Sequence, residues 1–331
     1  MKILLVTPPL TQLNTPYPAT CHLVGFLRSQ GLIAEQMDMS IELINALFTR
    51  QKLEEIFELV STQSKLSKPN RILLQNADFY AKTIEPVMRF LGGKDNSLAQ
   101  RFCSLEFWPQ SKRLPNDDDL EWGFGMIGNH DRATHLCTLF LKDLCDFINQ
   151  TIDSRFELIR YAESLCLRLP EFEPLQQELN KPLSIVDELM LDLFSNRMAD
   201  SKPDMVGFTI PFPGNLYSAL RCAQWTKQYH PNIKIVLGGG YVNTELRSIS
   251  DSTIFDYTDY ITFDDGELPL LRLLTGGELI RTLYRSETGE IVRVNFESKE
   301  NVKFAEIGAP DYDELVQNNY CLLYTSDAAD E

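Results

Sequence analysis

The chain has 331 residues, of which 44% are hydrophobic and 24% are charged, and its formal net charge is -16. This is the composition of a globular protein, and the length suggests about two domains. The acidic balance argues against nucleic acid and anionic membrane surfaces as partners, because the mean field of the chain repels phosphate.

Targeting and redox signals favour the cytoplasm. The apolar run at residues 3–6 is too short for a signal peptide, and no run approaches the ~18 apolar residues of a membrane helix. The seven cysteines are scattered and contain no C-x-x-C pair. We therefore expect a cytoplasmic protein with reduced thiols and no membrane partner.

The last eleven residues, CLLYTSDAADE at 321–331, resemble the translated read-through of a sequencing-library adapter. We expect the native sequence to stop near Tyr320 and leave residues 321–331 out of the fold prediction. On this interpretation the chain is the front part of a longer protein. The alternative is a short C-terminal tail that belongs to the protein.

Residues 1–42 predict a β-α-β unit. The run from Ile3 to Thr7 is rich in leucine and β-branched residues and ends at two prolines, as expected for a strand buried on both faces. A helix is predicted from Pro18 to a stop at Gly31. A second strand is predicted at 32–37.

Residues 43–200 predict a large α-helical insertion. Apolar residues recur at helical spacing between 136 and 148 and again between 189 and 194. Glycine, proline, asparagine and aspartate gather at 92–96 and at 114–119, where loops are expected.

The α/β pattern resumes at residues 201–278. Strands are predicted at 205–210, 233–237 and 260–263, with helices after each, and Asn215 is expected to cap the first of these helices. Residues 279–320 are assigned to a hairpin, with strands at 283–286 and 291–295, and to a linker. We predict an α/β fold with a five-stranded, doubly wound parallel sheet of flavodoxin-like order 2-1-3-4-5, formed by 1–42 plus 201–278 and split by the insertion between strands 2 and 3.

Four loops would meet at the carboxyl edge of this sheet, where ligands of open α/β sheets bind: 7–17, 209–215, 238–243 and 264–267. Three glycines at 238–240 would allow a flat ligand to approach the backbone. The acidic loop at 264–267 precedes a helix with free N–H groups. The simpler alternatives are a tight turn at the glycines and helix caps at Asp264 and Asp265. The chain has neither G-x-x-x-x-G-K-[ST] nor G-x-G-x-x-G after its first strand.

Several stretches resemble the N-terminal half of radical SAM proteins that contain a B12-binding domain. They are LLVTPP at 4–9, Tyr17-Pro18, VGFTIPFPGN at 206–215, VLGGG at 236–240 and DDGE at 264–267. The hairpin and APDY at 309–312 resemble that family's bridge into the radical SAM barrel. The resemblance covers 1–42 and 201–320 and does not place the insertion.

The resemblance implies that the corrinoid ring of cobalamin lies over the strand tips. The implied cofactor-binding residues are Pro8, Pro9, Thr209, Pro211, Phe212, Gly214, Asn215, Gly238, Gly239, Gly240, Asp265, Gly266 and Glu267. Pro8 and Pro9 would border the ring, residues 209 and 211–215 would line one edge of the tail pocket, and Glu267 would contact ring amides or cap the last helix.

The sequence departs from the family in two ways. The C-x-x-x-C-x-x-C motif, which holds the [4Fe-4S] cluster that cleaves S-adenosylmethionine, is absent, so we assign no catalytic residue. A radical SAM domain following the chain would supply it, for methyl transfer or other radical chemistry. The D-x-H-x-x-G loop is absent too, so cobalamin would bind base-off without that axial histidine. Two alternatives stay open: an α/β binding module without corrinoid, and half of a nucleotide-sugar-using enzyme.

Other residues are weaker candidates. His130, His135 and Cys137 lack the fourth donor and the spacing of a zinc site, so we expect surface or core positions and no metal. His22 could approach the ligand, although a packed or solvated histidine is the simpler interpretation. The aromatic stretches at 107–109 and 122–125 would form either a lid or part of the helical core.

Overall fold

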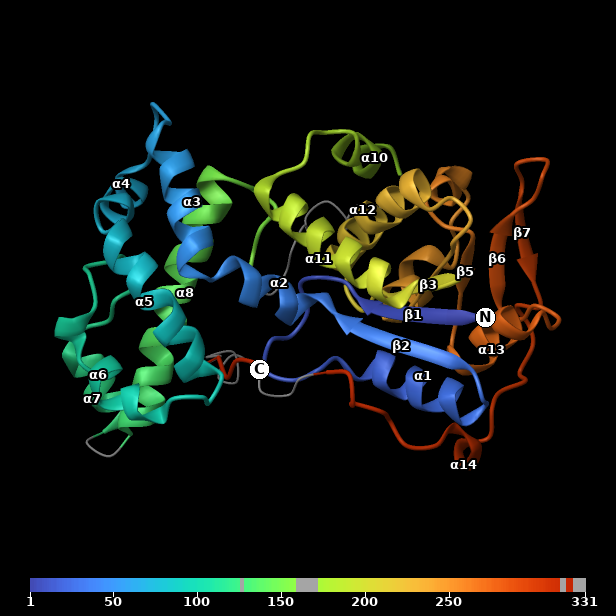
Figure 1. Cartoon of the computed structure of the whole chain (residues 1–331), viewed down its shortest axis with the longest axis horizontal. Helices are drawn as coiled ribbons and strands as arrows, with labels where there is room; N and C mark the ends of the chain where they lie inside the picture. The colour runs from blue at the N-terminus through green and yellow to red at the C-terminus, as the bar shows by residue number, and fades with distance from the viewer. Residues whose placement is uncertain (126–127, 159–171, 316–319, 324–331) are drawn as a thin grey trace.

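The computed structural model describes residues 1–125, 128–158, 172–315 and 320–323. Figure 1 shows an α/β part on the right and a lobe of helices on the left. Cys166 and residues 324–331 of the expected adapter-like tail lie outside the described residues. Within the described part, no helix is both long and apolar enough to cross a membrane.

A seven-stranded sheet forms the centre of the α/β part, with the order β2-β1-β3-β4-β5-β6-β7. The strands are β1 (Lys2–Thr7), β2 (Ile33–Asp38), β3 (Met205–Thr209), β4 (Lys234–Gly238), β5 (Tyr260–Thr262), β6 (Thr282–Arg285) and β7 (Ile291–Val294). The first five pair in parallel, and β6 and β7 are antiparallel. The α/β class is confirmed. The expected strand count of five is wrong, because the hairpin joins the same sheet through Ile261 and Leu283.

Helices cover both faces of the sheet. On one face, α1 (Pro18–Ser29) and α13 (Glu267–Thr275) pack over Ile3, Leu5 and Val236. On the other face lie α11 (Ile185–Ser201) and α12 (Pro213–Tyr229), where the Phe194 and Phe208 rings are 6.0 Å apart. Burial on both faces explains why the parallel strands show continuous apolar runs in the sequence.

The helical insertion divides into two parts. α2 (Met39–Leu47) starts directly after β2, and a lobe follows, made of α3 (Arg50–Ser61), α4 (Lys68–Gln75), α5 (Ala77–Leu91), α6 (Ala99–Phe102), α7 (Asp117–Phe124) and α8 (Asn129–Thr151). α10 (Glu173–Leu179) and α11 return to the α/β part and contact α12 (Figure 1). The prediction of a loop at 114–119 is wrong from Asp117 onward, where α7 begins. Acidic residues are favourable in the first turn of a helix.

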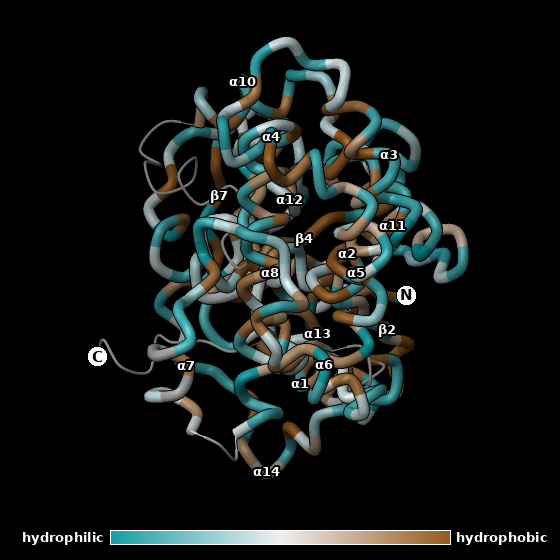
Figure 2. The backbone as a smooth tube through the Cα atoms, turned by 90° about the vertical axis from the view of Figure 1, so that its left-hand side faces the viewer, coloured by the Kyte–Doolittle hydropathy of each residue, from teal (hydrophilic) through white to brown (hydrophobic). Residues whose placement is uncertain are grey.

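The lobe has an aromatic core. Trp108 is 7% exposed, its Nε1 donates a hydrogen bond to the Phe102 carbonyl over 2.9 Å, and its ring lies 5.3 Å from that of Phe140. Figure 2 shows hydrophobic and hydrophilic stretches alternating along the helices of this lobe, as amphipathic helices require. The interpretation of the aromatic stretches as part of the helical core is therefore confirmed for Trp108. Trp122 does not belong to this core, because it is 92% exposed.

The segment after β7 folds back along α1 and β2. Arg28 forms ion pairs with Asp311 at 2.6 Å and Glu314 at 2.5 Å. Gly25 permits this contact, because a Cβ at this position would lie 2.2 Å from the Ala309 carbonyl oxygen. The Tyr320 hydroxyl donates to the buried Asp38 carboxylate over 2.8 Å. The linker expected around 309–312 is therefore packed on the α/β part.

Candidate functional site

A cavity of about 320 Å³ opens at the carboxyl ends of the parallel strands, between the sheet and the helices α1 and α13. Its size is at the lower end of the range of small-molecule pockets. The floor is formed by Leu5, Gly207 and Val236 of the sheet. A Cβ at Gly207 would lie 2.7 Å from the Leu5 Cδ2 atom, so the missing side chain keeps this floor open.

Six of the thirteen predicted cofactor-binding residues line this cavity: Thr209, Gly238, Gly239, Asp265, Gly266 and Glu267. They come from the ends of β3 and β4 and from the start of α13, as the topology of a parallel sheet requires. The other seven do not line it: Pro8, Pro9, Pro211, Phe212, Gly214, Asn215 and Gly240.

Asn215 connects two strand-tip loops. Its Nδ2 donates to the Pro8 carbonyl over 3.0 Å, and its Oδ1 accepts from the Phe212 N–H over 3.2 Å. Ser218 donates in the same way to the Pro9 carbonyl over 2.9 Å. α12 begins at Pro213, so Asn215 is its third residue and Phe212 is the N-cap, and the Asn215 side chain caps the helix start by accepting from the Phe212 N–H. These contacts are structural and leave Asn215 fully buried.

Gly239 is required by its backbone. Its φ is +111°, and a Cβ there would lie 2.6 Å from the Ile210 nitrogen. Two hydrogen bonds hold the backbone of Ile210 against this turn. The Ile210 N–H donates to the Gly238 carbonyl over 2.7 Å, and the Tyr241 N–H donates to the Ile210 carbonyl over 3.0 Å. The tight-turn interpretation therefore accounts for Gly239, which also borders the cavity.

The acidic loop contains one paired and two unpaired carboxylates. Asp264 has a φ of +61°, forms an ion pair with Arg247 and lies 3.7 Å from the buried Arg281 Nε. Asp265 and Glu267 form no hydrogen bond or ion pair with the residues that the structure describes. Gly266 is the N-cap of α13 and no side chain caps this helix, so the alternative that Asp264 and Asp265 serve only as caps is wrong.

Helix α1 supplies a wall that the motif-based prediction missed. Ala19, Thr20 and Leu23 line the cavity, and His22 lines it while remaining exposed. The Thr20 hydroxyl is buried and has no hydrogen-bond partner among the described residues. The helical spacing of Ala19 and Leu23 marks one helix face in the sequence, but it does not show that this face leaves space over the sheet.

Next to the cavity, Tyr17 and Phe212 form an edge-to-face pair with ring centroids 6.4 Å apart. Burial raises the pKa of Tyr17, so its hydroxyl stays neutral at physiological pH. Phe212 is 52% exposed and leaves an aromatic surface at the strand tips.

Two further histidines lie in the lobe. The His130 ring lies 5.1 Å from that of Phe90, and the His135 ring 5.4 Å from that of Phe124. Burial raises the pKa of the Cys137 thiol well above its ordinary value. In the described ranges, no three His, Cys, Asp or Glu side chains gather in a metal-binding arrangement.

The charged side chains that line the strand-tip cavity are acidic, namely Asp264, Asp265 and Glu267, and no described lysine or arginine lines it. The cavity thus offers hydrogen-bond acceptors to a ligand and repels polyanions. No family model matches the chain, and no curated protein or solved structure matches it either.

Proposed function

We propose that the chain binds cobalamin at the carboxyl edge of its sheet, with the corrin ring over the strand tips and the nucleotide tail in the cavity. The observation that supports this most is the opening of about 320 Å³ between the sheet, α1 and α13. The five parallel strands follow the order β2-β1-β3-β4-β5, which is that of flavodoxin-like sheets. Ligands of such sheets bind at this edge, where the strand order reverses.

The charge of the lining favours a corrinoid over a nucleotide sugar. A nucleotide sugar would bring a diphosphate next to Asp264, Asp265 and Glu267, with no described lysine or arginine in the lining to neutralise it. Cobalamin carries one phosphate and many neutral amide groups on its ring. Those amides can donate hydrogen bonds to the unpaired carboxylates of Asp265 and Glu267, and hydrogen bonds to charged acceptors are strong.

The remaining lining residues fit this arrangement. Gly238 and Gly266 let a ligand reach the backbone, and Thr20 and Thr209 offer hydroxyl groups beside them. When bound, cobalamin would supply organometallic chemistry. The chain would hold and orient it for a radical SAM domain, in keeping with methyl transfer or other radical chemistry in the parent enzyme.

A binding experiment tests this function. Purified chain is mixed with hydroxocobalamin, passed over a gel-filtration column and examined for visible corrinoid absorbance, while UDP-glucose is titrated by calorimetry. We expect corrinoid to elute with the protein and UDP-glucose to give no binding heat. Protein free of corrinoid would favour a binding module of another kind, and tight UDP-glucose binding would favour the nucleotide-sugar alternative.

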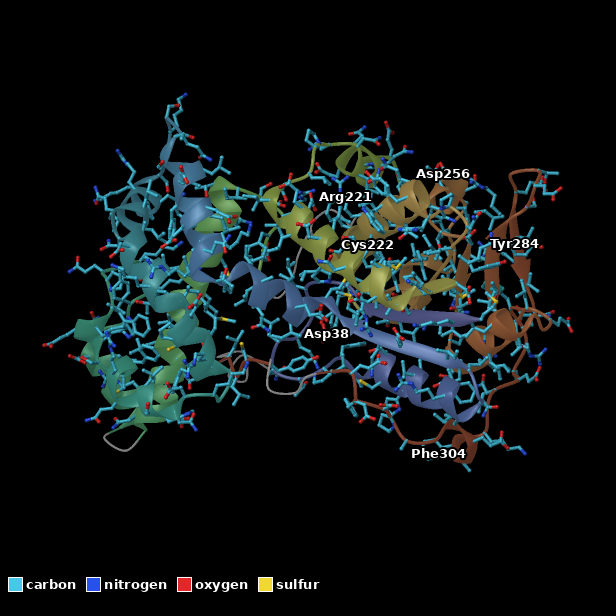
Figure 3. The ribbon with its side chains drawn as sticks, viewed as in Figure 1. Asp38, Arg221, Cys222, Asp256, Tyr284 and Phe304 are labelled. Carbon is cyan, nitrogen blue, oxygen red and sulfur yellow. The ribbon has the colours of Figure 1, made fainter. Side chains whose placement is uncertain are left out.

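Substituting the two unpaired carboxylates sharpens the test. The double variant Asp265→Asn, Glu267→Gln should weaken cobalamin binding by roughly tenfold or more, because two charged acceptors become neutral. Asp256→Asn is the control, since Asp256 (labelled in Figure 3) is exposed, pairs with Arg285 at the surface and does not line the cavity. Equal affinity of both variants would show that Asp265 and Glu267 do not contact the ligand.

A further inference from the structure

The helical lobe contains a second cavity, of about 350 Å³, away from the strand tips. It lies between α4, α8, Tyr80 of α5 and the segment 110–112. Figure 1 shows these helices on the opposite side of the molecule from α1 and α13. The cavity is therefore separate from the site proposed for cobalamin.

Buried polar groups form part of the wall of this cavity. Asn70 is 6% exposed and Asp143 is 8% exposed. Asparagine and aspartate are seldom buried, because desolvating their polar atoms costs free energy unless hydrogen bonds compensate. The lobe keeps these groups beside a hollow, although its aromatic core around Trp108 and Phe140 is closely packed.

Asp143 is only partly compensated. Burial raises the pKa of Asp143, and the Ser111 side chain and the charge of Arg113, whose Nε lies 3.6 Å from Oδ1, offset this only in part. Asp146 holds the stronger contacts, with Arg113 at 2.7 Å and Lys112 at 2.8 Å. Asp143 can therefore accept a further hydrogen bond from a ligand in the cavity.

Amide groups of α4 and α8 also line the cavity. The Asn70 Nδ2 donates to the Gln150 Oε1 over 3.1 Å, which leaves the other atoms of this amide pair to face a ligand. The hydroxyl of Tyr80 is neutral, because burial and the nearby Asp143 raise its pKa. Such groups can both donate and accept hydrogen bonds.

One part of the lining is apolar, and the formal charge of the whole lining is balanced. Pro69, Ile72 and Leu73 form an apolar wall. The charged lining side chains are Lys68, Lys112, Asp143 and Asp146, two of each sign, so their formal charges cancel. A ligand with a net charge would find no surplus of the opposite sign to offset its desolvation.

From these observations we propose that the lobe contains a second binding site, for an uncharged ligand that joins an apolar ring to an amide or hydroxyl group. The ring packs on Ile72 and Leu73. The amide or hydroxyl bonds to Asp143 and to the Asn70–Gln150 pair.

Three probes of the same shape and different charge test the proposal: nicotinamide, nicotinate and 3-(aminomethyl)pyridine, which are neutral, anionic and cationic at pH 7. Binding is measured by chemical-shift titration of ¹⁵N-labelled protein. We expect nicotinamide to shift resonances of α4 and α8. It should bind at least about tenfold more tightly than either charged probe, because each charged probe would bring one uncompensated charge into the cavity. No nicotinamide binding, or preference for a charged probe, would overturn the proposal.

Two variants locate the binding. Ile72→Trp fills the mouth of the cavity from a side chain that is 39% exposed, so the fold should survive and nicotinamide binding should be lost. Leu59→Trp introduces the same side chain on α3, where Leu59 is 49% exposed and does not line the cavity, and it should bind like the parent chain. Nicotinamide binding that survives in Ile72→Trp would place the ligand elsewhere and contradict the proposal. Hydroxocobalamin retention should be equal in both variants, which separates this site from the strand-tip site.

Discussion

Charged side chains gather in two regions of the molecule, and the regions use them differently. At the junction between the helical insertion and α12, the Arg155 guanidinium contacts Asp153 at 2.7 Å and Asp187 at 2.8 Å. Tyr217 donates to Asp187 over 3.1 Å and accepts from the Arg221 Nε over 3.0 Å. Arg221 reaches this cluster from α12 (Figure 3). The junction is closed, and its charges are paired.

The strand tips show the opposite arrangement. Asp265 and Glu267 stand beside a cavity and form no ion pair with any described residue. The comparison teaches that a dense cluster of buried charges indicates structure when every partner is present. The unpaired charges at the strand tips stand beside open space, and this is where we propose that a ligand binds.

The largest effect is expected at the junction. Asp187 is fully buried, so Asp187→Asn leaves Arg155 and Arg221 short of one negative charge and should lower the free energy of unfolding by about 3–5 kcal/mol. Urea denaturation followed by circular dichroism measures the loss. Asp192→Asn, on the exposed side of the same helix, is the control and should change stability little. A loss below about 1 kcal/mol for Asp187→Asn would show that the junction does not depend on charge pairing.

The next effect concerns Gly239, which borders the strand-tip cavity and lies against the backbone of Ile210, the residue after β3. Gly239→Ala should destabilise the chain by about 2–3 kcal/mol, because the new Cβ meets the Ile210 backbone and φ is positive. Gly289→Ala separates the two causes, since Gly289 also has a positive φ, of +87°, but nothing within 4 Å of its Cβ position. That variant should lose only about 1 kcal/mol. Equal losses in thermal unfolding would contradict a close approach at Gly239.

A smaller effect is expected at Glu42, a half-buried acid in the first turn of α2. Burial, and after it the charge of Asp38, raise the pKa of Glu42 from its ordinary value of 4.5 to about 7. Between these values the folded state holds a proton that the unfolded state has lost, so this contribution to stability falls as pH rises from 4.5 to 7 and is constant above. Glu42→Gln should remove this dependence and stabilise the chain at pH 8 by on the order of 1–2 kcal/mol. Parallel stability curves for the two proteins between pH 5 and 8 would contradict the raised pKa.

Much of the α/β architecture follows from local sequence. The strand at Ile3 to Thr7 and the helix that starts at Pro18 are both present, because apolar runs, prolines and glycines act within a few residues. The strand that pairs with the hairpin could not be predicted from local sequence. Joining Leu283 to Ile261 depends on contacts across the fold, which no local pattern specifies.

The candidate site was predictable in part. The ends of parallel strands must lie at one edge, so Thr209, Gly238 and Glu267 were expected together, and they line one cavity. Pro8 and Pro9 were expected there too, but their carbonyls are taken by Asn215 and Ser218. Hydrogen bonds between distant segments decide which tip residues remain available, and they cannot be predicted from spacing.

Filling the strand-tip cavity tests the central claim most directly. Ala19→Phe places a ring in the cavity from the wall of α1, and Ser29→Phe places the same ring at the exposed end of that helix, outside the cavity. Each protein is mixed with hydroxocobalamin, and the corrinoid that elutes with it is measured. We predict retention by the parent chain and by Ser29→Phe, and loss in Ala19→Phe with unfolding temperature unchanged within about 2 °C. Equal retention by all three proteins, or no retention by any, would contradict the account.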